Sequence, residues 1–233
     1  MDRIKLSIEG IPALVWGEAS ERVILAVHGS SSHKADTPIA LLAQCASEKG
    51  CQVLSFDLPG HGERAAQPAR CGVQEGVREL RIILRYAQEN WKRISLFANS
   101  LGAYFSLLAY AEAPLERAWF LSPLVDMQRM IANMMNWFGV SEERLKRERE
   151  IPTPAGQPLE WDYYCYVREH PVQVWNVPTE ILYGGADETV ERDTVETFVR
   201  QFSCRMEVVP EAVHYFHTPE QMDALRRWLE KTM

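Results

Sequence analysis

The 233-residue sequence contains no apolar run of the length that a membrane-spanning helix needs, which is about 20 residues. Its first residues also lack the basic start followed by an apolar stretch that is typical of a secretory signal peptide. We therefore expect a cytoplasmic protein that has no membrane partner.

The sequence also lacks an excess of basic residues. Its formal net charge is −7, and a surface of this sign repels the phosphate backbones of nucleic acids. This charge disfavours nucleic acid as a partner, and the sequence gives no information on the oligomeric state.

Paired cysteines and metal-ligand spacings are absent as well. The five cysteines are scattered and form no CxxC pair, so neither a zinc site nor a redox motif is indicated. Free thiols are typical of a reducing cytoplasm. No glycine-rich phosphate loop is found, and we expect no cofactor and no metal.

The sequence does contain a regular alternation of predicted strands and helices. Residues 4–8 and 13–15 alternate in polarity, which indicates two antiparallel strands. Continuous apolar runs, typical of strands covered on both faces, follow at 23–27, 53–56, 94–97, 118–121, 181–183 and, more weakly, 206–209. Helical periodicity marks 39–46, 73–87, 101–111, 195–202 and 218–229. The pattern predicts an α/β fold with a mostly parallel sheet and helices on both faces.

One segment interrupts this alternation. Residues 124–176 show no clear strand and combine methionines, a charge run, a proline-rich stretch and an aromatic cluster. We interpret 1–123 and 177–233 as the core and 124–176 as a small helical lid inserted between two strands.

The sharpest chemical signal surrounds Ser100. It follows an apolar strand and precedes an apolar helix, with the small residues Ala98 and Gly102 two positions to either side. A serine on such a tight turn projects its hydroxyl above the sheet as a nucleophile. A helix N-cap is the alternative role for this serine. The helix that begins at Leu101 directs backbone N–H groups toward developing negative charge.

A second loop follows the strand at 23–27 and begins His28-Gly29-Ser30. Such a loop can supply a further oxyanion-hole N–H, which we assign to Ser30, with Leu101 as the other donor. A third motif, Asp-Leu-Pro-Gly-His-Gly at 57–62, follows the next strand, and its histidine is interpreted as a turn residue.

These motifs, taken with Gly-Gly-Ala-Asp at 184–187 and a late histidine, resemble the α/β-hydrolase superfamily in the same chain order. The match spans about residue 23 to the C-terminus and is similar to small lidded esterases and lipase-like serine hydrolases. The usual pattern has glycine where Ala98 stands. The resemblance implies an α/β-hydrolase fold, Asp187 as the catalytic acid and His214 as the base. Asp126 is the alternative acid, and His217 is expected to be peripheral.

The resemblance implies a Ser-His-Asp serine hydrolase that cleaves a small carboxylic ester through an acyl-enzyme. The lid composition favours an apolar or aromatic acyl group. A thioester, amide or carbon–carbon hydrolase, or a slow ligand-binding protein of the same fold, are the alternatives. The candidate substrate-binding residues are His28, Asn99, Met130, Met134, Trp161 and Tyr164.

Overall fold

The computed structural model describes residues 3–66, 71–154 and 156–233, and it divides into two compact units. The main unit comprises residues up to Val125 and from Val174 onward, and the inserted unit is Asp126–Gln173. Each unit has its own buried residues. The two are described separately below.

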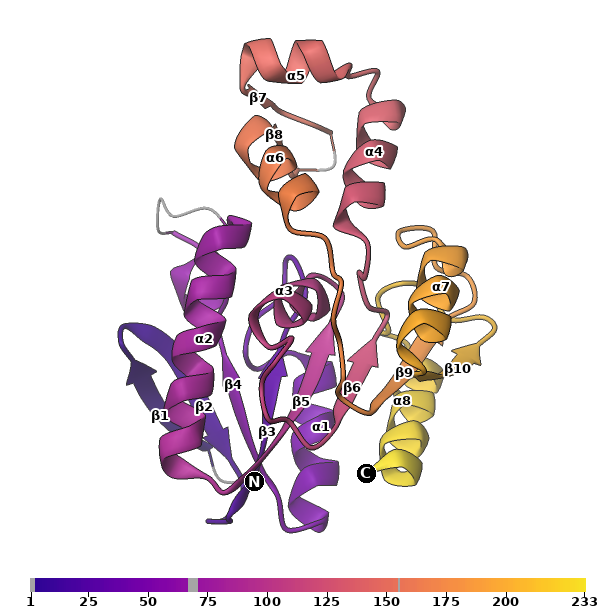
Figure 1. The fold of residues 1–233 in the computed structure, drawn as a ribbon. Coiled ribbons are helices and arrows are strands. Elements are labelled where there is room, and N and C mark those ends of the chain that lie inside the picture. Colours follow the sequence, from indigo (N-terminus) through magenta and orange to yellow (C-terminus); the bar gives the residue numbers. More distant parts are fainter. Residues whose placement is uncertain (1–2, 67–70, 155) are drawn as a thin grey trace. The chain divides into compact units, whose positions relative to one another are not determined.

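The main unit is built on an eight-stranded sheet in the order β1-β2-β4-β3-β5-β6-β9-β10 (Figure 1). The strands are β1 (Arg3–Ile8), β2 (Ile11–Trp16), β3 (Arg22–Val27), β4 (Gln52–Phe56), β5 (Arg93–Asn99), β6 (Ala118–Leu121), β9 (Thr179–Gly184) and β10 (Arg205–Val209). β2 runs antiparallel to β1 and β4, and every other pairing is parallel. The predicted mostly parallel sheet is confirmed.

Helices cover both faces of this sheet, as predicted (Figure 1). They are α1 (Thr37–Glu48), α2 (Val73–Asn90), α3 (Leu101–Ala109), α7 (Arg192–Phe202) and α8 (Pro219–Thr232), with a short 3₁₀ turn, η1 (Gly62–Arg64). α1 and α8 pack side by side over one face, and α2 and α3 pack together. The central strands are almost wholly inaccessible because apolar side chains bury both of their faces.

Local signals explain where the helices begin. Asp36 accepts a hydrogen bond from the Ile39 N–H and so caps α1. At α8, Thr218 and Gln221 form the predicted reciprocal capping box. None of the helices in the described ranges is long and apolar enough to cross a membrane.

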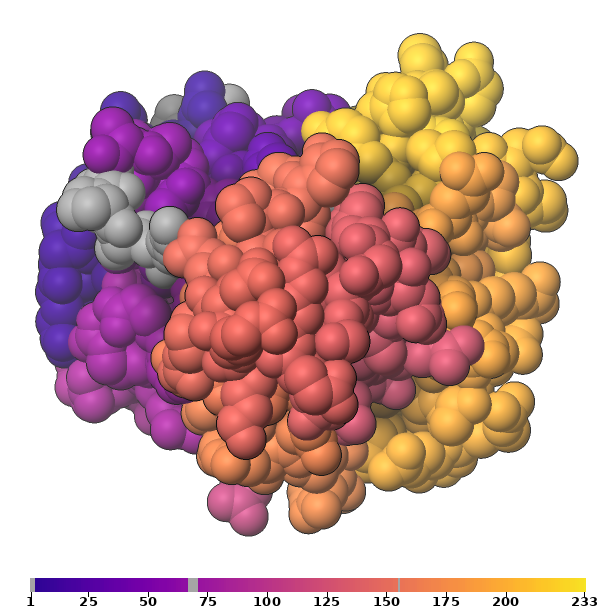
Figure 2. Space-filling model, turned by 90° about the horizontal axis from the view of Figure 1, so that it is seen from above, coloured from indigo at the N-terminus to yellow at the C-terminus, as the bar shows by residue number. Residues whose placement is uncertain are grey.

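The inserted unit contains three helices and one very short strand pair. These are α4 (Met127–Trp137), α5 (Glu142–Glu148), β7 (Glu150–Ile151), β8 (Leu159–Glu160) and α6 (Trp161–Glu169). The sequence indicated no strand here, since two-residue strands are too short to produce a polarity alternation. Buried Leu145, Ile151, Leu159 and Val167 form its small core, and its atoms form one continuous body (Figure 2). Its action as a lid stays a prediction.

Candidate active site

Ser100 lies in a sharp turn between β5 and α3. Its backbone adopts φ 49° and ψ −116°, a conformation that residues with a side chain rarely adopt. Two hydrogen bonds hold it there: the Ser100 N–H donates to the Leu121 carbonyl at 3.1 Å, and the Leu124 N–H donates to the Ser100 carbonyl at 3.2 Å. Strain of about 1–3 kcal/mol persists at such a position only when surrounding contacts impose it.

Small neighbours allow this turn to form. A Cβ atom on Gly102 would lie 2.5 Å from the His28 carbonyl oxygen, and one on Gly29 would lie 3.2 Å from the Ser100 Cβ. Gly102 therefore lets α3 approach the end of β3 closely, and Gly29 lets the loop after β3 lie against Ser100. Ala98, which replaces the glycine of the usual motif, is fully buried on β5 between Val27 and Phe120 of the neighbouring strands.

The structure brings His214 next to Ser100. The His214 Nε2 lies 2.8 Å from the Ser100 Oγ, and the His214 Nδ1 lies 2.7 Å from the Asp187 Oδ2. A carboxylate only accepts hydrogen bonds, so Nδ1 carries the proton and Nε2 is free to accept the serine proton. This geometry can activate a hydroxyl nucleophile.

Backbone groups of its own loop hold Asp187 in place. Its Oδ1 accepts the Thr189 N–H at 2.8 Å and the Val190 N–H at 2.9 Å, and its side chain is fully buried. The alternative acid, Asp126, uses its Oδ1 to cap α4 by accepting the Arg129 N–H. The carboxylate that contacts the His214 ring is thus that of Asp187.

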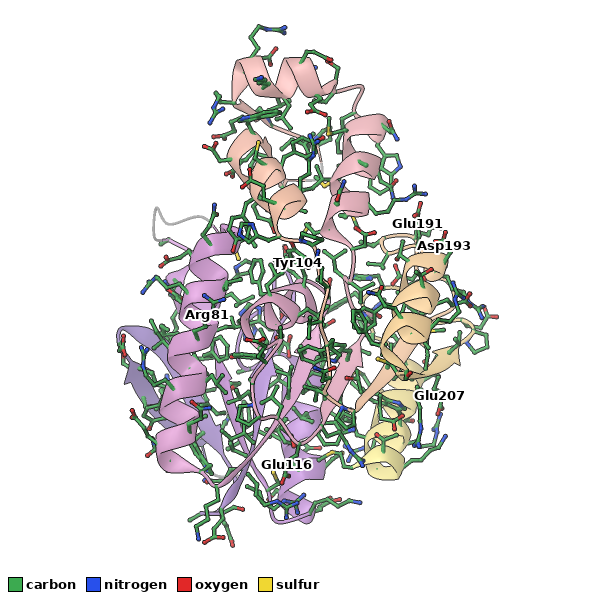
Figure 3. The ribbon with its side chains drawn as sticks, in the orientation of Figure 1. Arg81, Tyr104, Glu116, Glu191, Asp193 and Glu207 are labelled. Carbon is green, nitrogen blue, oxygen red and sulfur yellow. The ribbon has the colours of Figure 1, made fainter. Side chains whose placement is uncertain are left out.

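An alternative role for Asp187, as an acid that stabilises the N-terminus of a helix, does not fit its position. α7 begins at Arg192, with Glu191 at its N-cap and Asp193 in its first turn, where acids are favourable with the helix dipole (Figure 3). Asp187 precedes this turn, and its carboxylate is oriented by the loop and the imidazole.

Two consecutive glycines let the loop that carries Asp187 and the loop that carries His214 approach each other. A Cβ atom on Gly184 would lie 2.5 Å from the Ala212 carbonyl oxygen, and one on Gly185 would lie 2.6 Å from the Pro210 carbonyl oxygen. The Ala186 N–H donates to that same Ala212 carbonyl at 2.9 Å. Sequence reasoning missed this role, although two consecutive glycines shortly before Asp187 are the signal that could have revealed it.

The loop after β3 carries the expected oxyanion donor Ser30. Its neighbour Ser31 has a positive φ of 58°, and Ser100 and Ser122 also have positive φ values, of 49° and 41°. Three of the parallel strands of the sheet are therefore followed by a serine with a positive φ. The other expected donor, Leu101, begins α3, where the first N–H groups of a helix have no intrahelical acceptor.

Both ring nitrogens of His28 are engaged by backbone groups. Nε2 accepts the Leu58 N–H at 3.0 Å, so Nδ1 carries the proton and donates to the Gly29 carbonyl at 2.7 Å. Burial lowers the pKa of His28 from 6.5 to about 4, so the ring is neutral at pH 7. The ring thus joins the loop after β3 to the loop after β4, and a contact between His28 and substrate stays a prediction.

The remaining predicted substrate-binding residues belong to two parts of the chain. Asn99 is almost buried, and its side chain lies against Gly29. The other four belong to the inserted unit: Met130 and Met134 on α4, and Trp161 and Tyr164 on α6. The last two rings lie 5.6 Å apart, and the Tyr164 hydroxyl donates to Glu142 at 2.8 Å. Their contact with a substrate stays a prediction.

His217 differs from His214 in its surroundings. It is exposed, and its Nδ1 donates to the carbonyl of Tyr215, whose ring is parallel to its own. Across the described ranges, no group of three or more histidine, cysteine, aspartate or glutamate side chains is arranged to hold a metal ion.

The model of the alpha/beta hydrolase family matches residues 24–228. The chain belongs to this family. Its fold is similar to that of Est1E from Butyrivibrio proteoclasticus with ferulic acid bound, at 19% identity and a TM-score of 0.75 over 98% of each chain. A putative hydrolase from Agrobacterium vitis S4 aligns with a TM-score of 0.79 at 16% identity, over 99% of this chain and 98% of that one.

A probable serine hydrolase from Drosophila melanogaster is 31% identical over 113 residues. That stretch covers 46% of this chain and 31% of the relative, so the match spans about a third of the relative's length. The expected family and fold are confirmed.

Proposed function

We propose that this α/β hydrolase is a serine esterase that cleaves a small carboxylic ester through Ser100, His214 and Asp187. The observation that carries the proposal is the continuous hydrogen-bond chain from the Ser100 Oγ through both ring nitrogens of His214 to Asp187. A serine, a histidine and a buried carboxylate in this order form the unit that performs acyl transfer on several unrelated folds.

In the proposed reaction, His214 removes the proton from the Ser100 hydroxyl as its oxygen attacks the ester carbonyl. Asp187 holds the imidazole in the required tautomer and stabilises the imidazolium that forms. His214 then returns the proton to the leaving alcohol, which leaves an acyl-serine. Water, deprotonated by the same imidazole, releases the acid and regenerates Ser100.

The tetrahedral intermediate carries a negative charge on the former carbonyl oxygen. Backbone N–H groups aimed at that position stabilise it without any reorganisation during the reaction. We assign this role to the N–H groups of Ser30 and Leu101. The close contact between Gly29 and Ser100, and the start of α3 directly after the nucleophile, support the assignment.

We further propose an apolar or aromatic acyl group. The methionines of α4 and the aromatic side chains of α6 provide adaptable apolar surface within the inserted unit. The fold's similarity to Est1E, which was solved with ferulic acid bound, agrees with an aromatic acyl group. The cytoplasm is the proposed location because all five cysteines are free thiols.

The decisive experiment is labelling with a fluorophosphonate followed by peptide mapping. The adduct is expected on Ser100, and Ser100→Ala is expected to lose both labelling and hydrolysis of p-nitrophenyl butyrate while it remains folded. His214→Ala should abolish both as well, and its matched control, His217→Ala, should retain them. Full turnover by folded Ser100→Ala, or an adduct on another serine, would contradict the proposal.

A further inference from the structure

A buried lysine lies on the loop that carries Ser30. Lys34 is only 5% exposed, and its Nζ donates to the Asp57 Oδ2 at 2.5 Å and to the Glu63 Oε1 at 2.8 Å. The Asp57 side chain is fully buried, whereas that of Glu63 is 58% exposed. An ammonium is costly to bury, and the proposed reaction uses neither this group nor its partners.

Asp57 joins this lysine to a second loop, the one that follows β4. Its Oδ1 accepts the Lys34 backbone N–H at 2.9 Å, and its Oδ2 accepts the Glu63 N–H at 3.0 Å. A Cβ atom on Gly62 would lie 2.2 Å from the Asp57 carboxylate, so the chain wraps tightly around that group. The carboxylate is fixed in place, and Lys34 is fixed to it through both its backbone and its side chain.

The oxyanion loop therefore has an anchor at each end. At its start, the His28 ring accepts the Leu58 N–H, and at Lys34 the loop is bonded to Asp57. Both anchors connect it to the loop after β4. The segment between the two anchors includes Gly29, which lies against Ser100. It also includes Ser30 and then Ser31, whose φ is positive. A strained backbone between two anchors relaxes when one of them is removed.

The ion pair persists over the pH range in which esterases act. Burial alone lowers the pKa of Lys34, but the contacts with Asp57 and Glu63 outweigh it and raise the pKa above its ordinary value. Burial likewise works to raise the pKa of Asp57, and the hydrogen bonds from Lys34 and Glu63 lower it overall. Both groups stay charged near neutral pH.

We propose that Lys34 is a positioning residue of the oxyanion hole: its ammonium, held by Asp57 and Glu63, keeps the Ser30 N–H directed at the developing oxyanion. This inference rests on the proposed esterase function. It predicts that loss of the ammonium slows acyl transfer while ground-state binding of the ester is retained, because the hole binds the tetrahedral state more tightly than the ester.

The chain offers a matched control in a second buried ion pair. Arg64 donates to both carboxylate oxygens of Glu79, at 2.6 and 2.8 Å, and these two residues are 7% and 3% exposed. This pair connects η1 to α2 and includes no residue of the oxyanion loop. Glu79→Gln keeps Arg64, which also donates to the Asp57 carbonyl at 3.3 Å, and it measures what the loss of an equally buried ion pair costs in stability.

The experiment compares Lys34→Met with Glu79→Gln and wild type in three measurements. These are the melting temperature, kcat and KM for p-nitrophenyl butyrate, and the affinity of an alkyl trifluoromethyl ketone, whose serine adduct carries an oxyanion. We expect Lys34→Met to lower kcat by about 10- to 100-fold with KM within about twofold of wild type. The ketone should bind more weakly by a similar factor. Glu79→Gln should lose thermal stability and retain both kcat and ketone affinity.

Equal kcat values in Lys34→Met and Glu79→Gln would overturn the inference, as would a rise in KM at unchanged kcat. If Lys34→Met does not fold, Lys34→Gln replaces it, since an amide can still donate to Asp57. The expected result is then a kcat loss of about 3- to 10-fold at constant KM, and an unchanged kcat would overturn the inference. Failure of the proposed function is distinguishable, since wild type would then neither hydrolyse the ester nor react with a fluorophosphonate.

Discussion

Replacing Gly184 by alanine tests whether the contact between the acid and base loops sets the catalytic geometry. The added Cβ would lie 2.5 Å from the Ala212 carbonyl oxygen and 2.7 Å from the Val213 carbonyl oxygen. These are backbone atoms and cannot rotate away. An ordinary van der Waals contact is at least about 3.4 Å, so the loop that carries His214 must move by about 0.9 Å.

The size of the effect follows from that displacement. Overpacking of a buried contact costs about 1–3 kcal/mol of unfolding free energy. In a chain of this size each kcal/mol corresponds to about 2–4 °C in melting temperature. Misplacement of a catalytic group by about 1 Å can reduce the rate about 100-fold, so kcat should fall by about that factor.

Gly72→Ala is the matched control. An added Cβ at Gly72 meets nothing within 4 Å, and the backbone there has φ −72°, which alanine adopts freely. Steady-state hydrolysis of p-nitrophenyl butyrate and thermal unfolding would be measured on both variants. Wild-type kcat and melting temperature in Gly184→Ala would refute the reasoning, as would an equal loss in Gly72→Ala.

Three further predictions concern the acid, a buried histidine and the inserted unit. Asp187→Asn should lower kcat by about 10⁴-fold because an amide can stabilise the wrong imidazole tautomer, and Asp126→Asn, measured in the same assay, should retain activity. His28 is neutral when folded with a pKa near 4, so the unfolded chain binds more protons between that pH and 6.5. The free energy of unfolding is therefore highest above pH 6.5 and falls by up to about 3 kcal/mol toward pH 4. Measured by urea unfolding, this fall should be smaller in His28→Gln than in wild type. An identical pH dependence in the two proteins would contradict the prediction. Replacing 124–176 by a Gly/Ser linker should flatten the preference among esters of graded acyl length while acetyl esters are still cleaved, and an unchanged profile would place specificity elsewhere.

The sheet could be predicted from the sequence because its central strands are buried on both faces. Runs such as 23–27 and 118–121 are continuously apolar for that reason, and the turn residues that follow them mark one edge of the sheet. Ser100 and Asp187 follow such runs, whereas His214 follows the partly exposed edge strand β10, and its role was expected from the family resemblance.

The contacts that hold the site could not be predicted in this way. The approach of Gly184 to Ala212 joins two loops that are separated in the chain by α7 and β10. A pattern in the local sequence cannot predict a contact between segments so far apart. A lysine in a polar loop is ordinarily solvated, so Lys34 gave no sign of its burial against Asp57. Two-residue strands such as β7 leave no periodicity at all.

The serine that follows β6, Ser122, is a position near Ser100 at which a substitution should raise the stability of the fold. The Ser122 hydroxyl is fully buried and has no hydrogen-bond partner among the residues that the structure describes, and its backbone has φ 41°. Glycine adopts this conformation freely and has no hydroxyl to bury. Ser122→Gly therefore removes the backbone strain and the burial of an unpaired hydroxyl, each of which costs about 1–2 kcal/mol. The more flexible unfolded chain of the variant offsets about 1 kcal/mol of this gain. With serine at this position, the melting temperature is lower than the same fold would have with glycine. Chains evolved in the laboratory for heat resistance should acquire this substitution early, before any change in the hydrophobic core.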